Sequence, residues 1–282
     1  MIDIRQTEQY AKYLKSLGWT VERIGEINYF IKKMPILGSI LKLQRPEEIR
    51  FDTIKVLCHK YGVFQTIVEP KTELDAKYLA SIGFKLAKST YLPSKTLQLD
   101  LSLPTNRLIE RMKKDTRRVV RKGSGLTIKS YSTPDEIKMW QKEWRDSVKF
   151  ERYVPPAEQL IKLKKSFDDN HSLFLASHNI SGRIIGGALF TTSFHGISNY
   201  ITYYWQAFTN KEGRASLSQY SLLYQGILWA KKHGYKVFDF EGIFDSRFPN
   251  KTWLGFSHFK RSFGGYEVEY PGCYTKFNLF RK

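Results

Sequence analysis

Two pairs of matching segments in this chain constrain its fold more than any other feature. Residues 77–84 (KYLASIGF) align with 258–265 (HFKRSFGG), aromatic on aromatic, serine on serine and glycine on glycine. Residues 60–64 (KYGVF) and 232–238 (KHGYKVF) match in the same order, as a basic helix end, a glycine and a strand. Internal repeats indicate repeated structural units. The sequence therefore predicts two copies of one mixed α/β unit, with about nine extra residues in the second copy, between residues 242 and 252.

One difference between the copies bears on chemistry. The first copy has the apolar Leu79 where the second copy has Lys260. A lysine at a position that the repeat assigns to a helix core loses hydration, so something must compensate for its burial. Lys260 is therefore the leading candidate for a functional residue.

The charge balance limits the class of partner. The chain has 46 Lys and Arg residues against 27 Asp and Glu residues, a formal net charge of +19. Such an excess attracts nucleic acid, anionic lipid or a phosphorylated substrate. A basic surface that serves only solubility is the alternative.

Several classes of protein and site lack support. With 282 residues and 41% hydrophobic residues, the chain can fill two domain cores, and two cysteines suit a reducing compartment. No secretory signal is visible, and apolar runs such as 184–190 are far shorter than the roughly 18 residues of a membrane span, so a cytoplasmic protein is expected. No HExxH, CxxC, GxSxG or P-loop pattern occurs, and we expect no metal and no cofactor.

Hydrophobic periodicity predicts alternating helices and strands. The predicted helices span 6–18, 46–61, a segment capped by Thr72 and Asp75, 104–123, 134–151, 156–167 and 218–233, the last capped by Ser218. The predicted strands span 19–24, 28–36, 63–68, 172–177, 183–191, 199–205 and 236–240.

The segment 104–123 is strongly basic. Apolar residues recur in it at helical spacing, its other face has eight basic residues, and the whole segment has only two acidic residues. Such a face can follow a phosphate backbone, although a merely solvated helix face explains it equally well. The candidate phosphate-binding residues are Arg111, Lys114, Arg117, Arg118, Arg121 and Lys122.

A turn at 210–215 (NKEGRA) weakly resembles the pyrophosphate-binding turn of acyl-CoA N-acetyltransferases. It begins with Asn where Arg or Gln is usual and ends with Ala in place of Gly, so an ordinary polar loop is the favoured interpretation. The remaining candidates are Lys260 and the strand-end carboxylates Glu69, Asp239 and Glu241. This set suits attack of an amine on an activated acyl ester, which requires positioning and charge stabilisation.

Six segments together resemble the FemABX family, the aminoacyl-tRNA-dependent transferases that build peptidoglycan interpeptide bridges. They are the opening helix at 6–19, the strand at 66–70 (TIVEP), the domain-crossing strand at 96–101, the basic helix at 117–123, the helix and "yDfgGi" strand at 229–243, and the "FK..FG" motif at 259–264. The resemblance implies an α/β (α+β) fold of two tandem GNAT-like domains, with mixed sheets flanked by helices and no coiled-coil arm. The first domain, the acceptor platform, would comprise 1–95 and 268–282, and the second 96–267.

The resemblance also implies a reaction. An amino acid would move from aminoacyl-tRNA to the stem-peptide amino group of a peptidoglycan precursor, either lipid II or UDP-MurNAc-pentapeptide. Lys260 would stabilise the oxyanion, and Phe259 would pack the tRNA terminus. Glu69 would accept the proton of the amine, or would be only a hydrogen-bonded strand-end carboxylate. A monomer without a cofactor is expected, with transient contact to an anionic membrane surface.

The precursor-binding positions depart from the family. Its lysine in the opening helix falls on Leu14, and its arginine before Pro156 falls on Pro155. The nearby candidates for precursor binding are Lys12, Lys15, Arg152, Tyr203 and Tyr204. An acyl-CoA-dependent N-acyltransferase of the GNAT type and a non-catalytic RNA-binding protein remain the alternative functions.

Overall fold

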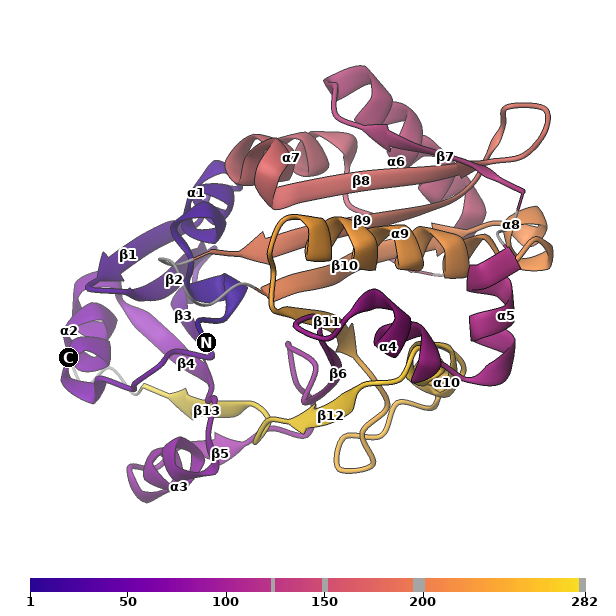
Figure 1. The fold of residues 1–282 in the computed structure, drawn as a ribbon. Coiled ribbons are helices and arrows are strands. Elements are labelled where there is room, and N and C mark those ends of the chain that lie inside the picture. Colours follow the sequence, from indigo (N-terminus) through magenta and orange to yellow (C-terminus); the bar gives the residue numbers. More distant parts are fainter. Residues whose placement is uncertain (123–124, 149–151, 195–200, 279–282) are drawn as a thin grey trace. The chain divides into compact units, whose positions relative to one another are not determined.

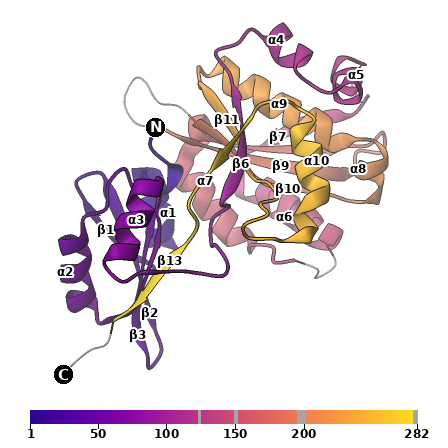
Figure 2. The same cartoon turned by 90° about the horizontal axis from the view of Figure 1, so that it is seen from below.

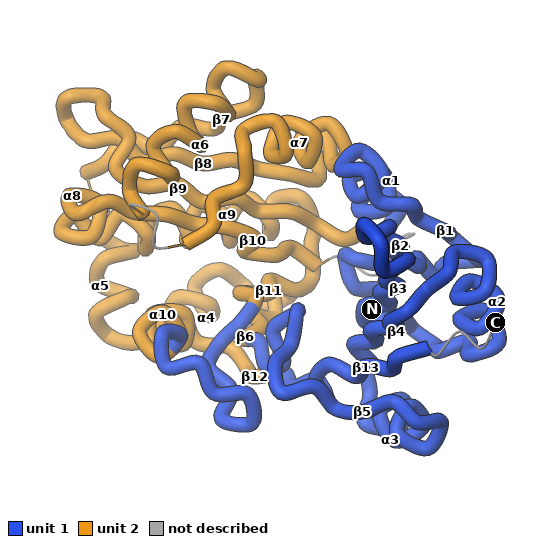
Figure 3. Tube along the Cα trace, turned by 180° about the vertical axis from the view of Figure 1, so that it is seen from behind, with its two compact units in different colours: residues 1–96, 242–253, 268–282 blue, residues 97–241, 254–267 orange. Residues whose placement is uncertain are grey.

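The chain folds into two compact α/β units (Figures 1 and 3). The structure is a computed structural model, and it describes residues 1–122, 125–148, 152–194 and 201–278. The first unit comprises 1–96, 242–253 and 268–282, and the second comprises 97–241 and 254–267. Each unit has a mixed sheet flanked by helices, so the predicted fold class is confirmed. The segment 242–253 groups with the first unit, whereas the sequence prediction placed it in the second.

The sheet of the first unit has the strand order β1-β2-β3-β4-β13-β5. Its strands are β1 (Thr20–Ile24), β2 (Ile27–Met34), β3 (Gly38–Gln44), β4 (Val63–Glu69), β5 (Lys85–Leu86) and β13 (Tyr274–Phe277). Its helices are η1 (Ile4–Gln6), α1 (Glu8–Ser16), α2 (Phe51–Tyr61) and α3 (Glu73–Ser81). Strands β1, β2 and β3 form an antiparallel meander, and helix α2 connects β3 to the parallel strand β4.

Side chains of β2 alternate between the two faces of this sheet, as a strand requires. Tyr29 and Ile31 join the larger core, which includes Leu79 of α3. Phe30 faces the other way and packs with Leu14 of α1. Helix α1 therefore covers one side of the sheet with its apolar side chains.

The sheet of the second unit has the order β12-β6-β11-β10-β9-β8-β7. Its strands are β6 (Lys95–Asp100), β7 (Thr127–Tyr131), β8 (Ser172–His178), β9 (Ile184–Ser193), β10 (Ile201–Thr209), β11 (Val237–Gly242) and β12 (Tyr266–Glu269). The helices of this half of the chain are α4 (Thr105–Glu110), α5 (Lys114–Lys122), α6 (Pro134–Val148), α7 (Ala157–His171), α8 (Lys211–Ala215), α9 (Ser218–Lys232), η2 (Lys251–Trp253) and α10 (Leu254–Arg261). Buried Trp140 of α6 anchors one face, because its Nε1 donates to the Leu175 carbonyl at 2.9 Å.

The repeated sequence corresponds to a repeated topology. The run β2-β3-α2-β4-α3 and the run β9-β10-α9-β11-α10 each contain an antiparallel pair, a parallel strand reached through a helix, and a following helix (Figure 1). The matching glycines Gly83 and Gly264 have similar φ angles of 88° and 85°. The extra residues of the second copy lie between β11 and α10, as predicted.

Three predicted boundaries are wrong. The basic segment forms two helices rather than one, because the Lys113 N–H donates to the Ser262 carbonyl at 2.8 Å and not within a continuous helix. Ser218 was predicted to cap α9 but is the first residue of that helix. The N-cap of α9 is Leu217, which has a left-handed φ of 55° and makes no side-chain capping hydrogen bond. Helix α2 begins at Phe51 rather than at residue 46.

The other boundaries agree to within about four residues or cannot be compared; α7, for example, ends at His171 rather than at residue 167. The Thr72 hydroxyl accepts from the Asp75 N–H at 3.1 Å, so the predicted cap is confirmed. The strands β3, β5, β7, β12 and β13 were not predicted. The predicted ends of three elements, at 123, 149–151 and 199–200, lie outside the described residues.

Candidate active site

Lys260 of α10 is almost completely buried, with 9% of its surface exposed. Its Nζ lies 4.9 Å from the ring centroid of Phe256 and 5.9 Å from that of Tyr204. Burial lowers the pKa of Lys260 to about 8, and the charges of Glu241 and Asp239 oppose that shift. Aromatic faces and carboxylates thus stabilise a cation that has lost most of its hydration.

The strands β10 and β11 part at the level of Tyr204. Their parallel pairing covers Ile201–Tyr203 and Val237–Asp239. Beyond it, β10 continues to Thr209 and β11 to Gly242, and the pairing of β10 with β9 shifts between Tyr204 and Gln206. Because a β-bulge bends its strand, it turns β10 at the residue whose ring faces Lys260.

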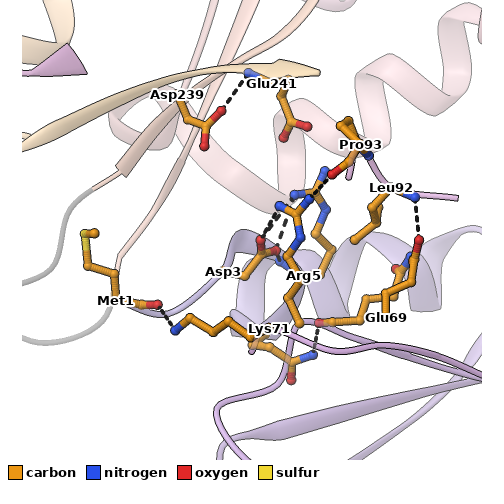
Figure 4. A network of polar contacts seen from close by, with 12 residues as sticks. Met1, Asp3, Arg5, Glu69, Lys71, Leu92, Pro93, Asp239 and Glu241 are labelled. Atoms are coloured by element: carbon orange, nitrogen blue, oxygen red, sulfur yellow. Dashed lines mark hydrogen bonds and ion pairs between the residues drawn. The ribbon is translucent and has the colours of Figure 1, made fainter. Parts of the chain in front are cut away.

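Glu241 has a strained backbone at this division. Its φ is 58°, in the left-handed region that side chains other than Gly, Asn or Asp rarely adopt. Asp239 holds this turn, because its Oδ1 accepts from the Glu241 N–H at 2.7 Å (Figure 4). The other oxygen of Asp239 accepts from Nε2 of Gln98 at 2.8 Å. Strain that the surroundings maintain is typical of functional sites, and here it places a carboxylate in the field of Lys260.

Arg152 approaches the same strand. Its Nη2 donates to the Ala207 carbonyl of β10, and its guanidinium lies 5.4 Å from the ring centroid of Trp144. Burial lowers the pKa of Arg152 and raises the pKa of Tyr204, and the two groups interact electrostatically. The structure therefore brings Tyr204 together with both Lys260 and Arg152.

Tyr203 lies beside Tyr204 in β10, but successive residues of a strand point to opposite faces of its sheet. Its side chain is buried, with 2% of its surface exposed. Of the two tyrosines predicted to bind the precursor, Tyr204 is the one whose ring faces Lys260.

Helix α10 also positions the basic segment. Oγ1 of Thr116 in α5 donates to Oγ of Ser262 at 2.7 Å, and Ser262 follows Lys260 by two residues. A Cβ on Gly264 would lie 2.9 Å from the carbonyl oxygen of Arg111, so that glycine permits the close approach. The "FK..FG" motif thus directs Lys260 inward and holds the basic segment beside it.

The predicted phosphate-binding side chains line the open side of this segment. Thr116 is on the buried side of α5. Of the predicted phosphate-binding residues, those with exposed side chains are Arg111, Lys114, Arg118, Arg121 and Lys122. Arg117 is half-buried and donates to the Glu110 carbonyl at 3.1 Å. A row of exposed cations beside a buried ammonium suits a large polyanionic substrate with a reactive end.

Phe259 belongs to an aromatic cluster. Its ring meets Tyr220 of α9 edge to face at a centroid distance of 4.9 Å and Phe263 at 5.5 Å. The ring is half-buried, so part of it remains accessible to a ligand.

Glu69 ends β4 in the first unit and has both carboxylate oxygens in hydrogen bonds (Figure 4). Its Oε1 accepts from the N–H groups of Tyr91 at 2.9 Å and Leu92 at 2.6 Å. Its Oε2 accepts from Nε2 of Gln44 at 2.8 Å. This geometry favours the structural interpretation of Glu69, because accepting a proton would disturb these bonds.

The remaining predicted precursor-binding residues, Lys12 and Lys15, lie in α1 of the first unit. Both side chains are exposed, whereas Leu14 between them is buried in the core beneath α1. Leu14 therefore has a packing role here.

The turn at 210–215 uses its own backbone donors. Oδ1 of Asn210 accepts from the Gly213 N–H at 2.8 Å, and the Asn210 carbonyl accepts from the Arg214 N–H at 3.0 Å. A Cβ on Gly213 would lie 2.1 Å from the Ile185 carbonyl oxygen, so this glycine packs against β9. These amides are therefore not oriented toward a pyrophosphate.

Within the described ranges, no group of three or more His, Cys, Asp or Glu side chains could hold a metal ion. In the same part of the chain, no helix combines the length and the hydropathy needed to cross a bilayer.

No protein-family model matches the sequence, and no curated protein matches it. Among solved structures, the crystal structure of FemX has a TM-score of 0.80 to this chain, covering 98% of this chain and 92% of FemX at 16% identity. This chain has a FemX-like tandem GNAT fold. Two further structures extend the FemX-like group. The C-terminal domain of a protein assigned as a lysylphosphatidylglycerol synthetase from Agrobacterium fabrum has a TM-score of 0.64, covering 96% of this chain and 88% of that domain at 12% identity.

The second of these further structures is a tandem GNAT protein from the clavulanic acid biosynthesis pathway. Its TM-score is 0.54, and the match covers 89% of this chain and 82% of that protein at 11% identity. At these identities the comparisons establish a FemX-like fold, and the fold that the six-segment resemblance implied is confirmed.

Sequence reasoning named Glu241 only as a strand-end carboxylate and missed the role of Ser262. A signal for Glu241 was present, because the "yDfgGi" motif has a glycine where this chain has Glu241. Glu241 has a positive φ in this chain, a conformation that glycine adopts without strain. Ser262 gave no comparable signal, since its bond to Thr116 joins residues that are distant in the sequence.

Proposed function

We propose that this protein is an aminoacyltransferase that moves an amino acid from aminoacyl-tRNA to the stem-peptide amino group of a peptidoglycan precursor. One observation carries the proposal: a nearly buried Lys260 of α10 lies where β10 and β11 part, and Ser262, two residues after Lys260, is hydrogen-bonded to α5, whose open side has a row of exposed cations. The FemX-like fold supports it.

In the proposed reaction, the amine of the acceptor attacks the ester carbonyl of the charged tRNA. A C–N bond forms, the C–O bond to the ribose breaks, and the ribose oxygen takes up the proton that the amine releases. Negative charge develops on the carbonyl oxygen before the C–O bond breaks. The Lys260 ammonium stabilises this charge, and its low exposure makes the interaction stronger than it would be in water.

The two substrates would use different cations. The tRNA phosphates would contact the exposed residues of α5, such as Arg118 and Arg121. Arg152, which lies against β10 and interacts with Tyr204, would bind the phosphates that lipid II and UDP-MurNAc-pentapeptide share. Phe259 would pack the terminal base of the tRNA.

The proposal is tested with purified protein, a panel of tRNAs charged with radiolabelled amino acids, and both acceptor forms. We expect label to appear on an acceptor with at least one charged tRNA. Absence of transfer across the whole panel would reject the proposal.

The alternative functions predict other results in the same assay. Transfer from an acyl-CoA but not from charged tRNA would identify a GNAT-type N-acyltransferase. Equal binding of charged and uncharged tRNA without any transfer would identify an RNA-binding protein.

A further inference from the structure

The tip of the β2–β3 hairpin exposes a cluster of apolar side chains. The loop of residues 35–37 joins Met34 of β2 to Gly38 of β3, and these two residues pair across the hairpin. Ile36 is fully exposed, with a relative exposure of 103%, Leu37 reaches 64% and Met34 reaches 36%. Figure 2 shows β2 and β3 with this loop at one end of the first unit. Single exposed apolar residues are common, but three of them at one turn need an explanation.

The backbone at this tip is also strained. Ile36 has a φ of 69°, and the Leu37 N–H donates to the Pro35 carbonyl at 2.8 Å. These features fit a γ-turn with positive φ, a rare and strained turn. A β-branched residue is among the least suited to this conformation, which favours Gly or Asn. Ile36 therefore lowers the stability of the folded chain in two ways, through its strained backbone and through the exposure of its apolar side chain to water.

Two lysines precede the apolar tip. Lys33 is exposed, and Lys32 is half-buried with its Nζ donating to the Gly18 carbonyl at 2.8 Å. The whole chain has a net charge of +19. An anionic lipid surface has phosphate headgroups outside and acyl chains beneath them. The apolar side chains at the tip suit the acyl chains, and the neighbouring lysines on this strongly basic protein suit the phosphates.

We propose that the tip of the β2–β3 hairpin inserts into an anionic lipid bilayer. Ile36, Leu37 and Met34 enter the boundary between headgroups and acyl chains, and Lys33 contacts the lipid phosphates. A folded protein partner fits less well, because a stable interface needs about 800 Å² on each partner and this tip consists of a few residues. The inference does not depend on the proposed reaction.

The test measures co-sedimentation of the purified chain with vesicles of phosphatidylglycerol and phosphatidylcholine, and with vesicles of phosphatidylcholine alone. We expect binding to the anionic vesicles and at least tenfold weaker binding to the neutral ones. Ile36→Asp should lower the affinity for anionic vesicles at least tenfold, since a charge at the tip prevents insertion. Lys33→Glu should also lower it.

Ile180→Asp is the matched control. Ile180 is also 103% exposed and lies in the turn between β8 and β9 of the other unit. Its substitution by Asp changes the net charge by the same amount as Ile36→Asp. It should leave vesicle binding within about twofold of the unsubstituted protein. Equal losses for the two variants would overturn the proposal, because they would show attraction by net charge without insertion of the tip.

Ile36→Gly separates binding from folding. Glycine relieves the positive φ, so the melting temperature should stay the same or rise while vesicle binding falls. Unchanged vesicle binding in this variant would overturn the proposal, as would absence of binding to anionic vesicles or equal binding to neutral ones.

Discussion

Lys260 and Leu79 occupy matching positions in the two copies of the repeat, and both are buried. In the first copy a leucine fills the core beneath α3, whereas in the second copy an ammonium takes that place. The lowering of the Lys260 pKa from 10.5 to about 8 corresponds to roughly 3 kcal/mol of unfavourable burial for the charged form. A residue maintained against such a cost is expected to contribute to function rather than to stability.

Replacing Lys260 should separate activity from stability. Lys260→Met removes the charge but keeps the length of the side chain, so we expect kcat/KM for transfer to fall at least about 100-fold. The free energy of unfolding should stay the same or increase, by up to roughly 3 kcal/mol. Lys165→Met, at an exposed site on α7, is the control and should change neither quantity. A loss of stability that parallels the loss of activity would instead assign Lys260 a structural role.

The pH dependence follows from the direction of the Lys260 shift. The ammonium form is lost as the pH rises through about 8, so transfer should decline above that pH. The folded pKa lies below the unfolded value, so burial of the charge disfavours the folded state fully below pH 8, and the effect fades between pH 8 and 10.5. The stability gained by Lys260→Met should therefore shrink over that interval, as urea titrations at several pH values would show. A gain that is constant with pH would contradict this assignment.

Glu241 offers a test that combines strain and charge. Glu241→Gly should raise stability by about 1 kcal/mol, because glycine adopts a φ of 58° without strain. It also removes a charge that raises the pKa of Lys260, so the alkaline decline in transfer should move to lower pH. Glu241→Gln should reproduce the move in pH without the gain in stability. If neither variant moves the decline, Glu241 does not act on Lys260.

At the scale of elements, α10 connects the buried ammonium to the basic segment. Ser262 receives a hydrogen bond from Thr116 of α5, and Gly264 lies against the Arg111 carbonyl between α4 and α5. These contacts explain why the basic segment breaks into two helices. They also fix the exposed cations of α5 relative to Lys260, which is the arrangement that a charged tRNA would require.

Charge reversal on α5 should weaken tRNA binding in a salt-dependent way. Replacing Arg118, Arg121 and Lys122 by Glu should lower tRNA affinity at least about 100-fold at low salt. It should also reduce the slope of log affinity against log salt by about two to three. The same triple reversal of Lys138, Lys142 and Lys165, exposed on α6 and α7, is the control. Nitrocellulose filter binding over a salt series measures both quantities, and equal losses in the two variants would argue against a specific role for α5.

At the scale of the whole molecule, the two copies of one topology differ in the side chains at matching positions, such as Leu79 and Lys260. Each sheet contains a strand from beyond its own repeat, β13 beside β4 and β6 beside β11. The second copy holds Lys260, Tyr204 and Arg152, whereas the first copy has a continuous apolar core at the matching position. In our proposals, the transfer chemistry belongs to the second unit and the membrane-binding hairpin tip to the first.

The sequence by itself determined the repeat, most helices and strands, and the basic segment, and it singled out Lys260 as a candidate. The helices and strands rest on neighbouring residues, because periodicity, caps and glycine turns are local. The repeat and the candidate Lys260 emerged from comparing two segments of the sequence. Only the tertiary structure decided that Glu69 has both oxygens in hydrogen bonds, that Glu241 is strained, and that 242–253 joins the first unit. Such features depend on contacts between distant residues, as in the bond from Ser94 to Asp245, which are 151 positions apart. No local pattern encodes a partner at that separation, and for this reason the chemical setting of the site emerged only from the folded chain.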